Sequence, residues 1–177
     1  GNYCSVTLQM TFMEMNLEQV PKVVELAIQE GVDRVKGHHL WAHFAEIKDQ
    51  DMRRNRDAIH RWNAIARKCI DLANENPLPN GKKIILANIY ELDPDHGGEL
   101  HPSATCPFLG QEAWVNHEGR FDPCCSPDEL RQTLVYFGNV QDDGLLAIWQ
   151  SAEYQHLLKN YLDNDVCRQC NMRQLPR

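Results

Sequence analysis

The sequence has no long apolar run, fewer basic than acidic residues, and fewer cysteines than a small disulfide-bonded scaffold needs. No stretch approaches the roughly 18 apolar residues of a membrane helix, and the amino end lacks the basic and then apolar layout of a secretory leader. The 18 Lys and Arg are scattered and are outnumbered by 25 Asp and Glu, which gives a formal net charge of −7. We therefore expect neither a nucleic acid nor a membrane partner, and a cytoplasmic location.

The seven cysteines are too sparse for a small disulfide-bonded scaffold, and their number is odd. Cys4 and Cys69 stand apart. The other five cysteines follow position 105, and two of them, Cys167 and Cys170, form a Cys-x-x-Cys pair. The five are Cys106, Cys124, Cys125, Cys167 and Cys170. Clustered thiols with close pair spacing, in a chain of cytoplasmic character, indicate a metal or iron–sulfur site.

Four of these thiols can converge on one point, as a tetrahedral zinc or a four-iron cluster requires. A glycine-containing hairpin can fold Cys124 back beside Cys106, and the pair Cys167 and Cys170 supplies two more thiolates. Adjacent residues of extended backbone point to opposite sides, so only one of Cys124 and Cys125 is expected to be a ligand. The spacing leaves open which of the two it is, and whether iron–sulfur or zinc is bound.

The first 92 residues alternate between strand and helix patterns. Alternation with a period of two predicts a strand at residues 6–12, and apolar residues at helical spacing predict a helix between the candidate cap Asn16 and Gly31. The pattern continues with a strand, a helix and a strand at residues 34–41, 58–73 and 83–91. This order predicts parallel strands joined by crossover helices, in about three strand–helix units.

The first strand keeps Thr7, Gln9 and Thr11 on one face. Strands buried on both faces are nearly continuously apolar, so this polar face favours a strand lining the interior of a partial, half β/α barrel. The uncovered edge of a small open sheet would give the same pattern. Because ligands of β/α barrels gather at the carboxyl ends of the strands, polar residues near those ends are candidate cofactor contacts. These are Glu14, Asn16, His38, His39 and Asn88.

The composition changes after residue 92. Residues 93–105 are rich in Pro, Gly, Asp and His, which is typical of a linker. A hairpin pattern then appears at residues 112–116 and 120–121, followed by one helical pattern over residues 142–161. The sequence therefore predicts an α/β domain at residues 1–92 and a small, cysteine-rich α+β domain at residues 106–177.

Four motifs of the second domain resemble the SPASM domain of radical S-adenosylmethionine enzymes, in that family's order and spacing. They are CPFLGQEAWVNHEGRFDPCC, FGNV, LLAIWQS and CRQC, at residues 106–125, 137–140, 145–151 and 167–170. The resemblance implies one auxiliary four-iron four-sulfur cluster bound by Cys106, Cys124, Cys167 and Cys170. It also implies that residues 1–92 are the later three strand–helix units of the family's partial barrel.

Two features of that family are missing from the sequence. No Cys-x-x-x-Cys-x-x-Cys motif occurs, which in the family binds the catalytic cluster and S-adenosylmethionine, and Pro176 stands where two-cluster members have a further cysteine. We expect the chain, which begins with Gly1, to be the carboxy-terminal part of such an enzyme and inactive alone. The full enzyme would bind S-adenosylmethionine and modify a peptide or other small substrate.

Two further hypotheses remain. The same four thiolates would also suit zinc in a non-enzymatic structural or partner-binding module. An arc of three strands leaves an unpaired edge on each side, so self-association through the open half-barrel is also expected.

Overall fold

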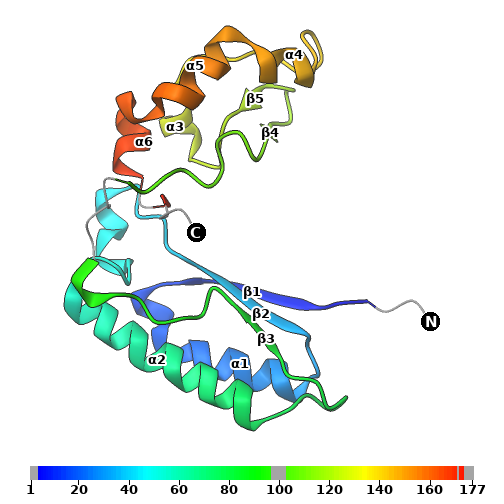
Figure 1. Cartoon of the computed structure of the whole chain (residues 1–177), viewed down its shortest axis with the longest axis vertical. Helices are drawn as coiled ribbons and strands as arrows, with labels where there is room; N and C mark the ends of the chain where they lie inside the picture. Colours follow the sequence, from blue (N-terminus) through cyan, green and yellow to red (C-terminus); the bar gives the residue numbers. More distant parts are fainter. Residues whose placement is uncertain (1–3, 97–102, 171, 174–177) are drawn as a thin grey trace. The chain divides into compact units, whose positions relative to one another are not determined.

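The structure is a computed structural model that describes residues 4–96, 103–170 and 172–173 (Figure 1). The chain falls into two compact units, residues 1–99 and 100–177, each with its own hydrophobic core. The linker predicted at residues 93–105 lies partly outside the described residues, and the predicted domain bounds stay a prediction. Within the described ranges no helix has both the length and the apolar character needed to cross a membrane.

The first unit contains a parallel sheet of three strands in the order β1, β2, β3. The strands are β1 (Thr7–Phe12), β2 (Arg34–His39) and β3 (Ile85–Ala87). The helices α1 (Val20–Gln29) and α2 (Arg56–Glu75) lie side by side on one face of the sheet (Figure 1). Three 3-10 helices complete the unit: η1 (Glu14–Gln19), η2 (Ala45–Gln50) and η3 (Pro94–His96).

The predicted mixed α/β class with parallel strands is confirmed, but the strands are shorter than the sequence pattern suggested. Two strand–helix units and a third strand are present, and in the first unit the described residues after β3 contain only η3. β3 ends early because Asn88 adopts a positive φ of 65°, which turns the chain out of extended geometry. The Asn88 side chain then donates a hydrogen bond to the Gly37 carbonyl at 3.0 Å. The described residues form no closed barrel.

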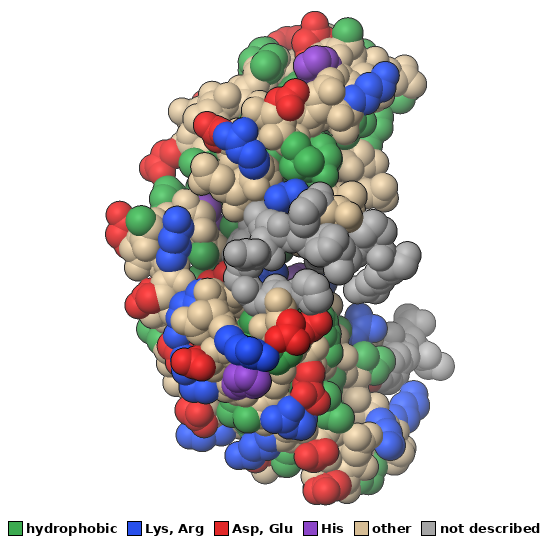
Figure 2. Space-filling model, turned by 60° about the vertical axis from the view of Figure 1, so that its left-hand side comes forward, with side chains coloured by type: hydrophobic (Ala, Val, Ile, Leu, Met, Phe, Trp, Pro, Cys, Tyr) green, Lys and Arg blue, Asp and Glu red, His purple; other side chains and the backbone are tan. Residues whose placement is uncertain are grey.

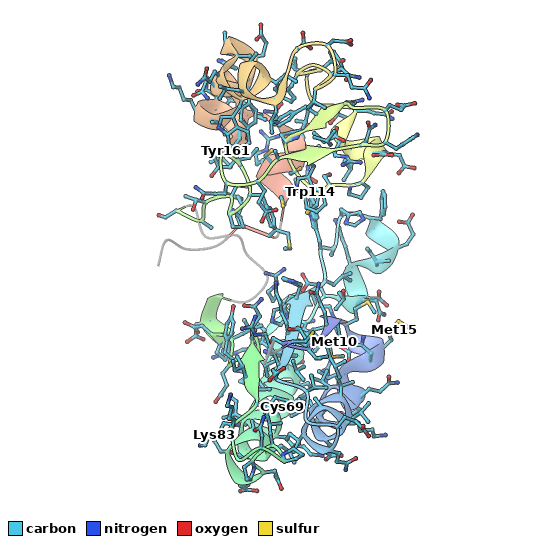
Figure 3. All side chains as sticks on the ribbon, turned by 90° about the vertical axis from the view of Figure 1, so that its right-hand side faces the viewer. Met10, Met15, Cys69, Lys83, Trp114 and Tyr161 are labelled. Carbon is cyan, nitrogen blue, oxygen red and sulfur yellow. The ribbon has the colours of Figure 1, made fainter. Side chains whose placement is uncertain are left out.

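The core of the first unit lies between the sheet and the apolar stripe of α2. Trp62 is fully buried, its ring centroid is 4.5 Å from that of Phe12, and its indole N–H donates to the Tyr90 carbonyl at 2.8 Å. Cys69, labelled in Figure 3, belongs to the same stripe and is fully buried. Burial raises the pKa of Cys69 to about 12, as suits a small core residue that stays protonated.

The amino end of α2 is capped by Asn55, whose side-chain oxygen accepts the Ala58 backbone N–H at 2.8 Å. Replacing Asn55 by alanine leaves that N–H without its partner, and we expect a loss of about 1 kcal/mol in the free energy of unfolding. Urea denaturation of the full chain measures this loss. Asn55→Asp, which keeps the acceptor, is the control and should unfold near the wild-type midpoint. An Asn55→Ala midpoint equal to wild type would contradict the prediction.

The second unit is a small α+β arrangement. Its antiparallel hairpin pairs β4 (Trp114–Val115) with β5 (Phe121–Asp122). Five short helices follow: α3 (Asp128–Arg131), α4 (Leu145–Gln150), α5 (Ala152–Asn160), η4 (Tyr161–Asp163) and α6 (Asp165–Gln169). Phe121, Phe137, Ile148, Tyr154 and Leu157 form most of its buried core.

The prediction of a single helix over residues 142–161 is wrong, because the helix is interrupted at Ser151. Ser151 has extended dihedral angles, and its hydroxyl accepts the Tyr154 N–H at 3.2 Å, so it caps α5 instead of continuing α4. The apolar stripe is common to both short helices, which is why periodicity alone joined them.

Figure 2 shows acidic and basic side chains interspersed on the face it presents, in keeping with the scattered charges of the sequence.

Candidate metal centre

The five clustered thiols come from three segments of the second unit. Cys106 precedes β4, Cys124 and Cys125 directly follow β5, Cys167 lies in α6 and Cys170 ends it. Burial raises the pKa of Cys124 and Cys170 to about 11 and that of Cys167 to about 12. The charges of neighbouring thiols add to each of these rises, which shows that the three segments face a common region.

The donor set fits a thiolate-bound metal group. Thiols with raised pKa stay protonated in the bare protein near neutral pH, and a metal drives their deprotonation by supplying positive charge. Among the described residues, no group of three or more His, Cys, Asp or Glu is arranged to hold a single metal ion. A four-iron cluster sets a different requirement, because each of its four thiolates binds a different iron.

Cys124 and Cys125 occupy different environments. Cys124 is buried, with 9% of its surface exposed, and its charge interacts with those of the other four clustered thiols. Cys125 is half-buried, and its pKa is raised first by burial and then by the charges of Glu112 and Cys106, while Arg131 lowers it. Cys125 therefore lies on the side of the cysteine cluster that faces the charged residues Glu112 and Arg131.

The β4–β5 turn positions Cys124. Gly119 has a positive φ of 84°, and a Cβ at this position would lie 2.5 Å from the side-chain oxygen of Asn139. The side-chain oxygen of Asn116 accepts the Glu118 and Arg120 N–H groups at 3.0 and 2.9 Å, which closes the turn from within. The turn therefore requires glycine at 119, and it delivers β5 and the cysteine after it in one orientation.

The Cys106 segment is tied to the core by Tyr154. The Tyr154 ring is fully buried against Phe121, at 5.2 Å between ring centroids, and its hydroxyl accepts the Gly110 N–H at 3.1 Å. Burial raises the pKa of Tyr154, so the hydroxyl stays neutral. The same core thus supports the segments of both Cys106 and Cys124.

A buried charge network lies beside Cys124 that sequence reasoning missed. Asp122 is 3% exposed, and its carboxylate forms ion pairs with Arg120 at 3.3 Å and Arg131 at 3.2 Å. Burial raises the pKa of Asp122, and the two arginines oppose that rise. These pairs join β5 to α3 on either side of Cys124 and Cys125. The sequence signal for this network was an acidic residue, Asp122, next to the apolar Phe121 in a short strand. The spacing of the sequence does not show that Arg120 and Arg131 pair with it.

Glu14 and Asn16, predicted as cofactor contacts, already have partners within the first unit. Glu14 accepts hydrogen bonds from Arg54 at 2.5 Å and Arg61 at 2.6 Å, and these lower its pKa. Asn16 lies inside η1, where its side chain accepts the Met13 N–H at 3.0 Å. α1 accordingly begins at Val20 and not directly after Asn16.

The other predicted contacts lie in β2 and directly after β3. His39 is held between Phe12 and Trp62, at centroid distances of 5.4 and 4.6 Å, and burial lowers its pKa to about 3. His38, the preceding residue of β2, points to the sheet face without helices, and its pKa is lowered by burial and then by Lys36. The side chain of Asn88 donates a hydrogen bond to the Gly37 carbonyl. Their roles toward a ligand stay predictions.

Comparison with known proteins identifies the second unit. Neither the curated proteins nor the solved structures gave a match to the chain. Residues 106–171 match the family model of SPASM, an iron-sulfur cluster-binding domain, and this range contains all five clustered cysteines. The SPASM resemblance recognised from the sequence is thus confirmed: residues 106–171 match the SPASM iron–sulfur cluster-binding domain.

Proposed function

We propose that this chain is the carboxy-terminal part of a radical S-adenosylmethionine enzyme and that its SPASM domain binds one auxiliary four-iron four-sulfur cluster. The observation that carries the cluster assignment is the gathering of buried and half-buried thiols from three segments inside the matched range. The full enzyme would act on a peptide or other small substrate, and this chain alone, without the Cys-x-x-x-Cys-x-x-Cys motif, would be inactive.

Cys106, Cys124, Cys167 and Cys170 would hold the cluster. We prefer Cys124 to Cys125 because Cys124 is the more buried and interacts with every other clustered thiol. When bound, such a cluster supplies one-electron transfer at a potential set by its surroundings. The protein's own part is to exclude water with the Phe121 and Tyr154 core and to hold the three cysteine segments in place.

The first unit would contribute part of the barrel wall. Its three strands are parallel, and their helix-free face carries polar side chains in register: Thr7 beside Arg34, Gln9 beside Lys36 and Thr11 beside His38. A polar strand face with helices only behind it is the arrangement of a barrel lumen, where a substrate would lie. The free edges of β1 and β3 support the further proposal that the chain associates with itself or with a partner carrying the remaining strands.

Anaerobic reconstitution of the full chain tests the cluster assignment. Iron, acid-labile sulfide and zinc are measured on one sample, and we expect about four irons and four sulfides per chain. Cys167→Ala should lose them, whereas Cys4→Ala, which removes an exposed thiol outside the cluster, should not. One zinc without sulfide after reconstitution would overturn the proposal and favour the structural zinc module.

A further inference from the structure

Arg173 lies three residues after Cys170, outside the range matched by the family model. We propose that Arg173 fastens two cysteine-bearing segments to each other and places a positive charge beside the cluster, so that it both slows loss of iron and raises the reduction potential. The inference rests on the proposed function, because it concerns a cluster bound at these thiols.

The fastening is carried by two hydrogen bonds from one guanidinium. One terminal nitrogen, Nη1, donates to the Ala104 carbonyl at 3.3 Å, and the other, Nη2, donates to the Arg168 carbonyl at 3.1 Å. Ala104 is buried two residues before Cys106, and Arg168 lies between the paired cysteines. The rigid, planar fork of arginine therefore bridges the first ligand segment and the last.

The charge of Arg173 acts on the same thiols. It lowers the pKa of Cys167 and of Cys170, against the larger effect of burial. Its Nε–H is buried and has no hydrogen-bond partner among the described residues, so this donor is available to a sulfur acceptor of the loaded site. A cluster with four thiolates is anionic and gains negative charge on reduction, so a nearby cation favours the reduced state.

The other arginines near these thiols have acidic partners. Arg131, which lowers the pKa of Cys125, is paired with Asp122 and also contacts Asp128. Arg168 pairs with Asp165, and 60% of its side chain is exposed. Within the described part of the chain, Arg173 forms no ion pair, and its charge is therefore the least compensated of the three.

The test compares the anaerobically reconstituted full chain with Arg173→Gln and Arg173→Lys. Iron release to a chelator reports the fastening, and a redox titration followed by electron paramagnetic resonance gives the midpoint potential. We expect Arg173→Gln to release iron on the order of tenfold faster, as loss of an outer hydrogen-bonding partner does at other metal sites, and to have a lower potential. Arg173→Lys should release iron faster than wild type but have a midpoint potential close to that of wild type. The lysine ammonium keeps the positive charge, but it lacks the forked guanidinium that makes both hydrogen bonds.

Arg168→Gln is the matched control, because it removes a nearby positive side chain but leaves the backbone carbonyl that Arg173 uses. It should resemble wild type in both measurements. If wild type loads its cluster and both Arg173 variants match it in iron release and potential, the inference is overturned while the proposed function stands. If wild type takes up no iron–sulfur cluster, the proposed function fails, and this inference fails with it.

Discussion

We expect Cys124→Ser to abolish stable cluster binding and Cys125→Ser to leave the cluster in place. A serine at 124 removes a thiolate from the buried centre of the group, where its charge interacts with all four other clustered thiols. Loss of an outer partner already weakens metal binding roughly 10- to 100-fold, so loss of a direct ligand should weaken it at least that much. Iron and sulfide per chain after reconstitution and desalting measure the difference.

Each of the two single variants is the control for the other, because the two cysteines are adjacent and each variant removes one thiol. Circular dichroism of the metal-free proteins checks that both variants fold. Equal iron retention in the two variants would show that either cysteine can serve, and loss of iron from Cys125→Ser alone would reverse the assignment. Cys125 would then be the ligand despite its position near Glu112 and Arg131.

We expect Gly37→Ala to destabilise the first unit strongly. Gly37 is buried in β2, and a Cβ there would lie 1.9 Å from Cζ of Phe12, closer than any real contact allows. Phe12 cannot easily move because Trp62 and His39 pack against its ring. We expect a loss of about 1–3 kcal/mol in the free energy of unfolding, the usual cost of overpacking, or more if the ring cannot adjust.

A double-mutant cycle shows whether this steric contact is the cause. Phe12→Leu shortens the side chain above Gly37, so adding it to Gly37→Ala should cost less than the sum of the two single changes. Thr11→Ala, on the helix-free face of the same sheet, should change stability little. Additive losses from Gly37→Ala and Phe12→Leu in urea denaturation would show that Phe12 is not what excludes a side chain at 37.

The order and type of most elements could be predicted from sequence periodicity, but their ends could not. Alternation gave β1 and helical spacing gave α2 because each pattern reflects one buried face. β3 and the helix at residues 142–161 ended elsewhere because single residues intervened: Asn88 adopts a positive φ, and Ser151 caps a new helix. Such local hydrogen bonds leave no period in the sequence.

The thiols of the site were found from spacing, since few other roles gather five cysteines in one domain. The choice within the adjacent pair could not be predicted, because it depends on burial and on Glu112 and Arg131 nearby. Asp122 and Arg173 were missed for a related reason: the partners of Asp122 follow no helix or strand period, and those of Arg173 are backbone carbonyls. Conversely, Glu14 and His39 looked free at strand ends, but they face Arg61 and Trp62.

The turn of the β4–β5 hairpin has a consequence for the order of assembly. A later segment completes it: the Phe121 N–H donates to the Gly138 carbonyl at 3.0 Å, and the Val140 N–H donates to the Gly119 carbonyl at 2.8 Å. The hairpin therefore takes its final form only when the FGNV motif docks on it. Cys124 is held in place through contacts made more than ten residues downstream, so the site is complete only in a domain whose FGNV segment has docked.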